Sequence, residues 1–142
     1  MQFVVNSLAA KAQSVTEIEA KLAARGVTAE IAARLVANAR RLGYLDDAEL
    51  AGQLARGFRA RGYGRRRAAQ ALRRRGLTAV AEAALDAAYG DIDETALAVA
   101  ALGTRVMSDA AAQRRAVAFL VRRGFTSSTA WRVVKGRAAG AD

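Results

Sequence analysis

Apolar, basic and glycine positions follow the same order in three segments of this chain. Each segment has Leu, two variable residues, Arg, Gly, an apolar residue and Thr, and the copies start at Leu22, Leu72 and Leu120. Offsets of 50 and 48 residues also align apolar positions on both sides of the motif: Val4 with Leu54 and Leu102, Leu8 with Phe58 and Val106, and Leu35 with Leu85 and Val133. Because the register is kept on both sides, the pattern indicates three tandem copies of one unit.

The shared motif is typical of the turn between two helices. Gly adopts the left-handed conformation that ends a helix, and the Arg before it faces the negative end of the helix dipole. The Thr that follows can cap the next helix by accepting hydrogen bonds from its free N–H groups. The motif predicts helix-end partners at Arg25, Arg75 and Arg123, and N-caps at Thr28, Thr78 and Thr126.

A longer helix is expected before the motif in each unit. It starts at Asp47, a good N-cap, in the second unit and near Asp93 in the third, where Leu97, Leu102 and Val106 follow. The last helix should run from Thr126 to about Lys135 and give way to a loose Gly/Ala tail. Short units that bury their apolar faces partly against neighbours favour an elongated, curved array over a compact bundle of all the helices. The sequence thus predicts an all-α fold of about nine helices in three tandem three-helix repeats, at 1–44, 45–90 and 91–142.

Composition supports helices and leaves little room for catalysis. The chain has 142 residues, of which 37 are Ala, with no Pro, no Cys and no His. Without His and Cys there is no imidazole base, thiol nucleophile or usual transition-metal ligand set. We therefore expect no enzyme activity, no cofactor and no metal. With no long apolar run and no signal peptide, a cytoplasmic protein without membrane attachment is expected.

Aromatic and acidic residues have structural interpretations. Phe119, Phe125 and Trp131 are expected in the core of the third unit. The pair Asp46-Asp47 is better explained as a helix start than as a catalytic pair of carboxylates, because no metal ligands accompany it.

Positive charge is concentrated in the middle unit. The net charge is +10, and 20 of the 23 basic residues are Arg. Between Glu49 and Glu82 there is no acidic residue, and this window holds nine arginines. Arg binds phosphate and carboxylate groups through its planar fork of donors. The candidate binding residues are Arg59, Arg61, Tyr63, Arg65, Arg66, Arg67, Arg73 and Arg74.

Two alternatives concern this basic region. The arginines are either a binding surface or solvated helix faces in a chain from an Arg-favouring genome. Within the predicted helix, Arg66 and Arg73 share one stripe, as do Arg67 and Arg74, because seven residues make two turns. Tyr63 either stacks on a nucleic acid base or packs beside the arginine side chains.

Motifs in the middle unit and just before it resemble a known family. Leu42-Gly-Tyr-Leu-Asp-Asp47, then Arg61-Gly-Tyr-Gly64 and Leu72-Arg-Arg-Arg-Gly76, are similar to the core signature of RecX-type proteins, the small bacterial regulators of the RecA recombinase. The resemblance extends over nearly the whole chain, which includes Ser14-x-x-Glu17 in the first repeat and Leu120-x-Arg-Arg-Gly124 in the third. Arg65 stands where that family often has Pro.

The resemblance implies a function without catalysis. Such proteins modulate RecA, mainly as inhibitors, in DNA repair, recombination and the SOS response. They bind in the groove of the RecA–DNA filament and limit strand exchange and ATP hydrolysis. The implied partners are the RecA filament, single-stranded DNA and also double-stranded DNA, bound by a monomer. The alternative is a stand-alone helical-repeat protein that binds DNA irrespective of sequence.

Overall fold

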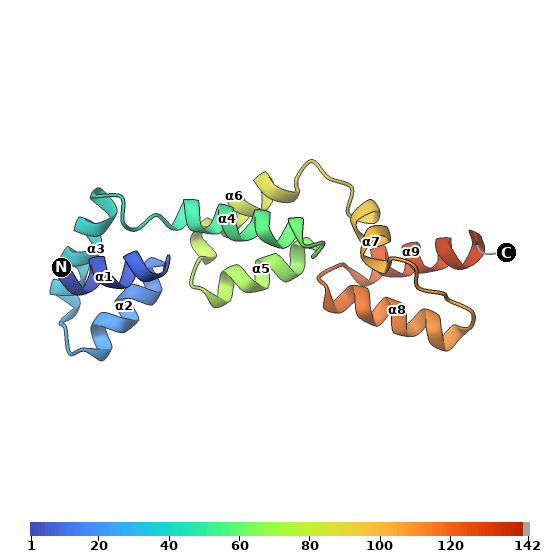
Figure 1. The fold of residues 1–142 in the computed structure, drawn as a ribbon, viewed down its shortest axis with the longest axis horizontal. Coiled ribbons are helices and arrows are strands. Elements are labelled where there is room, and N and C mark those ends of the chain that lie inside the picture. The colour runs from blue at the N-terminus through green and yellow to red at the C-terminus, as the bar shows by residue number, and fades with distance from the viewer. Residues whose placement is uncertain (141–142) are drawn as a thin grey trace.

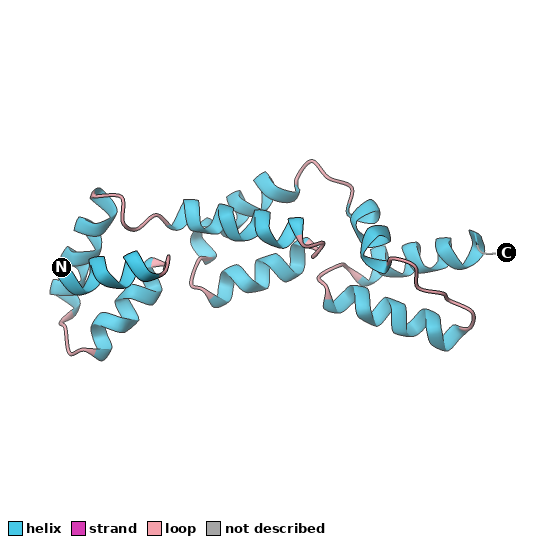
Figure 2. Cartoon of the chain, viewed as in Figure 1, coloured by secondary structure: helices cyan, strands magenta, loops and turns pink. Residues whose placement is uncertain are grey.

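The computed structural model describes residues 1–140, which form nine α-helices joined by loops, with no strand in that range (Figure 2). The predicted all-α fold is confirmed. The helices are α1 (Gln2–Ala10), α2 (Val15–Ala24), α3 (Ala29–Arg41), α4 (Asp47–Ala60), α5 (Arg65–Arg74), α6 (Thr78–Tyr89), α7 (Glu94–Leu102), α8 (Ala110–Arg122) and α9 (Ser127–Gly140).

The helices form three groups along one axis. Figure 1 shows α1 to α3, α4 to α6 and α7 to α9 placed one after another in an elongated molecule. Each group encloses its own cluster of buried apolar residues. The partly buried Leu97 packs against the clusters of both the second and the third group. A compact bundle of all the helices is thereby ruled out for residues 1–140.

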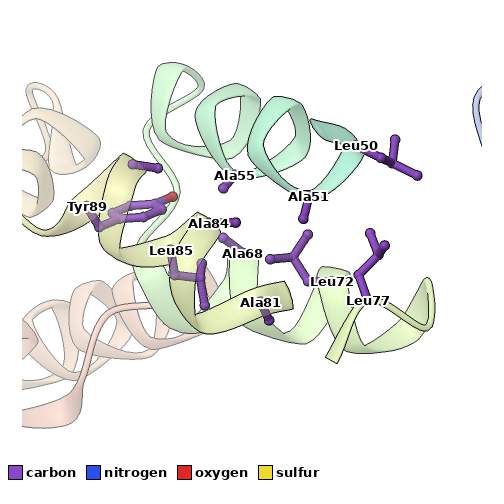
Figure 3. Packing of buried hydrophobic residues seen from close by; sticks show 11 residues of the cluster. Leu50, Ala51, Ala55, Ala68, Leu72, Leu77, Ala81, Ala84, Leu85 and Tyr89 are labelled. Carbon is purple, nitrogen blue, oxygen red and sulfur yellow. The ribbon is translucent and has the colours of Figure 1, made fainter. Parts of the chain in front are cut away.

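The middle group shows how small residues allow close packing. Figure 3 shows Ala51 and Ala55 of α4 facing Ala68 and Leu72 of α5, with Ala84 of α6 beside them. Ala51, Ala55, Ala68 and Leu72 have no solvent exposure. Alanine at these positions lets the three helices approach closely, while Leu72 fills the space between them.

Helix ends follow the predicted chemistry with two corrections. Gly26, Gly76 and Gly124 have positive φ, as the motif requires, and Thr28 accepts a hydrogen bond from Ile31 N–H. However, α6 begins at Thr78 itself, after Leu77, and has no side-chain cap. The cap of α4 is Asp46, which accepts from Glu49 N–H, so Asp47 is free to serve another helix.

The third group departs from the sequence alignment in two places. Because α7 ends at Leu102, Val106 lies beyond the helix and is 81% exposed, unlike its aligned partners Leu8 and Phe58. At the other end, α9 continues past Lys135 to Gly140, so the Gly/Ala tail is helical up to that residue. The last two residues of the predicted tail, 141–142, lie outside the described part of the chain.

The aromatic residues of the third group also differ from one another. Phe125 is fully buried and Phe119 is half-buried, which fits the predicted core. Trp131 is 37% exposed, with the Lys135 ammonium 5.7 Å from its ring centre, so its assignment to the core is wrong. The preceding residue, Ala130, is fully buried and faces the core of the third group instead.

No helix within residues 1–140 is both long and apolar enough to span a bilayer.

Candidate nucleic-acid interface

The helices α8 and α5 meet end to end where the second and third groups join. Gly64 N–H donates to the Arg123 carbonyl oxygen at 2.8 Å, and Arg66 N–H donates to the Gly124 carbonyl oxygen at 3.2 Å. Free amides at the start of α5 thus satisfy carbonyl groups at the end of α8. The dipoles of the two helices meet positive end to negative end, which favours this contact.

Tyr63 lies beside this junction among arginine side chains. The Arg123 guanidinium is 4.2 Å from the centre of its ring and donates to the Arg61 carbonyl oxygen at 2.7 Å. Arg67 approaches the same ring at 5.6 Å. In the structure Tyr63 packs beside these arginine side chains, and stacking on a nucleic acid base stays a prediction.

Tyr89 of α6 holds the loop that contains Tyr63 through a hydrogen bond. Its hydroxyl donates to the Tyr63 carbonyl oxygen at 2.9 Å. Burial raises the pKa of Tyr89 to about 12, because the phenolate would lose its hydration there. The hydroxyl therefore stays protonated and keeps donating to the loop at any ordinary pH.

Four of the nine arginines in the acid-free window find carboxylates from outside it. Arg56 lies 3.9 Å from Glu49, and Arg59 lies 3.7 Å from Asp91 and donates to the Ala88 carbonyl oxygen. Arg65 and Arg75 form the shorter pairs: Arg65 with Glu82 at 3.0 Å and Asp86 at 2.7 Å, and Arg75 with Glu17 at 2.8 Å. Arg59 and Arg65, both predicted binding residues, thus have structural roles.

The other five arginines of the window have no carboxylate within 4.0 Å among the described residues. All five side chains are exposed, and all were predicted as binding residues. Four lie on α5, and one caps α4. They are Arg61, Arg66, Arg67, Arg73 and Arg74.

Two clefts lie beside α5, and Arg67 lines both of them. One, of about 230 Å³, lies between α5 and α8 and is lined by Arg66, Arg67, Gln70, Arg73, Val121, Arg122, Gly124 and Phe125. The other, of about 280 Å³, lies between α5 and α4 and is lined by Leu54, Phe58, Arg67, Gln70, Ala71, Arg74 and Arg75. Four arginines and no acidic residue line the first cleft, so it favours an anion.

The arginines of α8 extend this surface beyond the predicted residues. Arg122 lines the first cleft, and it also lines a neighbouring cleft with Arg105 and Arg115. The Arg67 guanidinium donates to the Arg122 carbonyl oxygen at 3.1 Å, which ties the two helices together. Arg115 and Arg122 align with Arg67 and Arg74 in the repeat, and this correspondence is the signal that could have found them.

The junction between the first and second groups has similar geometry but different chemistry. Gly76, at the end of α5, lies against Thr16 of α2, and the Thr16 hydroxyl donates to its carbonyl oxygen at 3.4 Å. Glu17 binds Arg75, which lowers the pKa of that carboxyl group, chiefly through the hydrogen bond. Asp47 accepts from Val15 N–H at 2.9 Å and so holds the start of α2.

The repeated Arg of the motif therefore does more than face its own helix end. Arg75 and Arg123 each reach into the preceding unit, where they contact Glu17 and Tyr63. Arg25, in the first of the three units, lies 4.0 Å from the ring centre of Phe3. The interpretation of these residues as partners of the dipole alone is incomplete, because they also join successive units.

No group of three or more acidic residues that could hold a metal ion occurs within residues 1–140.

Comparison with known proteins shows a likeness of fold to a solved structure. No family model and no curated protein sequence matches the chain. Among solved structures, the crystal structure of regulatory protein RecX has the same fold, with a TM-score of 0.74 and 19% sequence identity. The match covers 95% of this chain and 69% of that one.

Proposed function

We propose that this chain is a cytoplasmic, non-enzymatic regulator of a RecA-type recombinase, which binds the nucleoprotein filament as a monomer. The observation that carries the proposal is the likeness of its fold to regulatory protein RecX along nearly the whole chain. The sequence motifs Gly43-Tyr-Leu-Asp-Asp47 and Arg61-Gly-Tyr-Gly64 support the same family independently of the fold.

The shape of the molecule suits a long, periodic partner. Three units at 1–44, 45–90 and 91–142, arranged in a row, can contact successive subunits of a filament groove. The exposed arginines of α5 and α8 would face DNA phosphates or acidic protein surface in that groove. We expect the bound protein mainly to inhibit, by blocking access of a second DNA molecule and by hindering exchange of subunits.

The test is the DNA-dependent ATP hydrolysis and strand exchange of RecA, with the protein added below the molar amount of RecA. A regulator that spans several subunits should slow both reactions at these low ratios. Absence of any effect at every ratio would contradict the proposal.

The second candidate is a stand-alone DNA-binding protein of no sequence preference. The cleft between α5 and α8 favours it, because the four arginines that line the cleft need no recombinase to attract phosphate. This candidate predicts equally tight binding to naked DNA and to RecA–DNA filaments in one salt series. Tighter binding to filaments favours the regulator.

A further inference from the structure

We propose that the junction of α5 and α8 is a composite binding site for a phosphate group of a nucleic acid strand. The site exists only while the second and third units are docked against each other. The inference rests on the proposed function in one respect, namely that the partner contains nucleic acid.

The chemistry of the cleft fits a phosphodiester. Arg66, Arg67 and Arg73 line one wall and Arg122 the other, and Gln70 adds an amide donor between them. The guanidinium groups of Arg66 and Arg73 have no hydrogen-bond partner within residues 1–140, so their donors are available. Planar guanidinium groups bind phosphate oxygens through paired hydrogen bonds, which a lysine cannot do.

Neither unit forms the cleft alone. Most of the arginines come from α5 and one from α8, and the walls are held by the main-chain bonds from Gly64 and Arg66 to the end of α8. The approach is as close as glycine permits. A Cβ atom on Gly124 would lie 2.5 Å from the Arg67 Cβ and backbone nitrogen, so alanine there must push the helices apart.

The first junction serves as an internal comparison. Its approach is comparably close, since a Cβ atom on Gly76 would lie 2.6 Å from the Thr16 Cβ, but the contact is made by a side chain and not by main-chain hydrogen bonds. In place of the residues that line the cleft on α5, however, α2 has Thr16, Glu17, Ala20 and Ala23. Joining two units therefore does not require arginines at these positions. Their concentration at the second junction, where like charges repel each other, indicates a bound anion rather than a structural need.

Three glycine variants of the full chain separate this site from general positive charge. Gly26→Ala, Gly76→Ala and Gly124→Ala all replace a glycine with positive φ and leave the net charge unchanged. The Gly26 position meets nothing within 4 Å, so it controls for backbone strain, and Gly76 controls for disruption of a junction that has no such cleft.

Binding is measured with a fluorescent single-stranded oligonucleotide over a series of salt concentrations, after circular dichroism has shown each variant to be folded. Gly124→Ala should weaken binding by about tenfold and lower the slope of log K against log salt by about 0.7 for each phosphate group that the variant no longer binds. Gly26→Ala and Gly76→Ala should bind as the wild type does.

A second variant avoids any risk to folding. Gln70 is exposed on α5, and Gln70→Glu places a carboxylate in the cleft that four arginines line. It should weaken binding much more than Gln2→Glu, which makes the same change of charge on α1. An oligonucleotide with neutral methylphosphonate links should bind weakly to the wild type and should not distinguish these two variants.

Four results would each overturn the proposal. The wild type could bind no oligonucleotide, or Gly124→Ala and Gln70→Glu could bind as tightly as the wild type does. The control variants could lose as much affinity as the cleft variants, or the wild type could bind the methylphosphonate strand tightly. The assay contains no recombinase. Loss of binding in the cleft variants together with no effect of the wild type on RecA would retain the phosphate site and reject the proposed function. If the wild type slows RecA but the cleft variants bind the oligonucleotide as the wild type does, only the phosphate site is rejected.

Discussion

Arg75 binds Glu17 of the preceding unit through two hydrogen bonds, from Nε to Oε2 at 2.8 Å and from Nη2 to Oε1 at 3.0 Å. The side chains are only 25% and 30% exposed, so water screens this pair less than a surface ion pair. The same Glu17 Oε1 accepts from Ser14 N–H at 2.8 Å. One carboxylate thus caps its own helix and joins two units.

This pair should make the stability of the protein depend on acid. The pKa of Glu17 in the folded chain lies below its ordinary value of 4.5, so ionised Glu17 stabilises the fold. The contribution is complete above pH 4.5 and is lost as the pH falls through the lowered pKa of the folded state. The Tm of the wild type should exceed that of Glu17→Gln at neutral pH, and the difference in Tm should shrink as the pH falls below 4.5. A difference that does not vary with pH would contradict this role.

Reversal of charge at Arg66 and Arg73 should weaken binding of the filament or of DNA while helicity and Tm stay nearly unchanged. Both side chains are exposed and have no carboxylate partner among the described residues, so their replacement breaks no ion pair within the fold. Arg34→Glu with Arg40→Glu is the matched control on α3, since it makes the same change of net charge at exposed positions. Equal binding by the two double variants would mean that the arginines of α5 are only a solvated face.

Leu72→Ala should lower the free energy of unfolding by about 2–5 kcal/mol, because the removed methyl groups leave a cavity between α4, α5 and α6. Leu72 is fully buried, whereas Leu42 is 52% exposed at the end of α3. Denaturant unfolding of Leu42→Ala should therefore show a change within about 0.5 kcal/mol. Similar losses in the two variants would show that Leu72 is not a core residue.

Tyr89→Phe should lower the free energy of unfolding by about 1 kcal/mol, because the Tyr63 carbonyl oxygen loses its donor. The raised pKa of Tyr89, about 12 against an ordinary 10.0, also means that stability falls as the pH rises between these values. The ultraviolet titration of tyrosinate should lose its most alkaline component in Tyr89→Phe. A component that persists in the variant would assign the raised pKa to another tyrosine.

The repeat and most helix ends could be predicted because they depend on neighbours in sequence. Gly26 and Gly124 end helices through their own backbone conformation, and Asp93 caps α7 by accepting from the backbone amide two residues ahead. Predictions of helix N-caps were wrong where neighbouring residues could each begin the helix. Asp46 took the cap expected at Asp47, and α6 began at Thr78 without the cap predicted there.

The pairing of charges could not be predicted in the same way. Arg65 contacts carboxylates 17 and 21 positions away, and Arg75 contacts one 58 positions away. A segment without acidic residues in the sequence can therefore still have carboxylates beside it in the folded protein. Likewise, Tyr63 is covered by Arg123 of another unit. These contacts arise from how the units dock, and no local pattern reports on docking.

By itself, the sequence determined that this protein is a row of helical units rich in arginine, because glycine, caps and apolar spacing act over a few residues. Only the tertiary structure decided which arginines are free. It placed Glu17, Glu82 and Asp86 against two of them, and it left Arg66 and Arg73 facing a cleft shared with α8. The physical reason is that ion pairs and clefts depend on distances between helices, and those are set by the close contacts of Gly64 and Gly124.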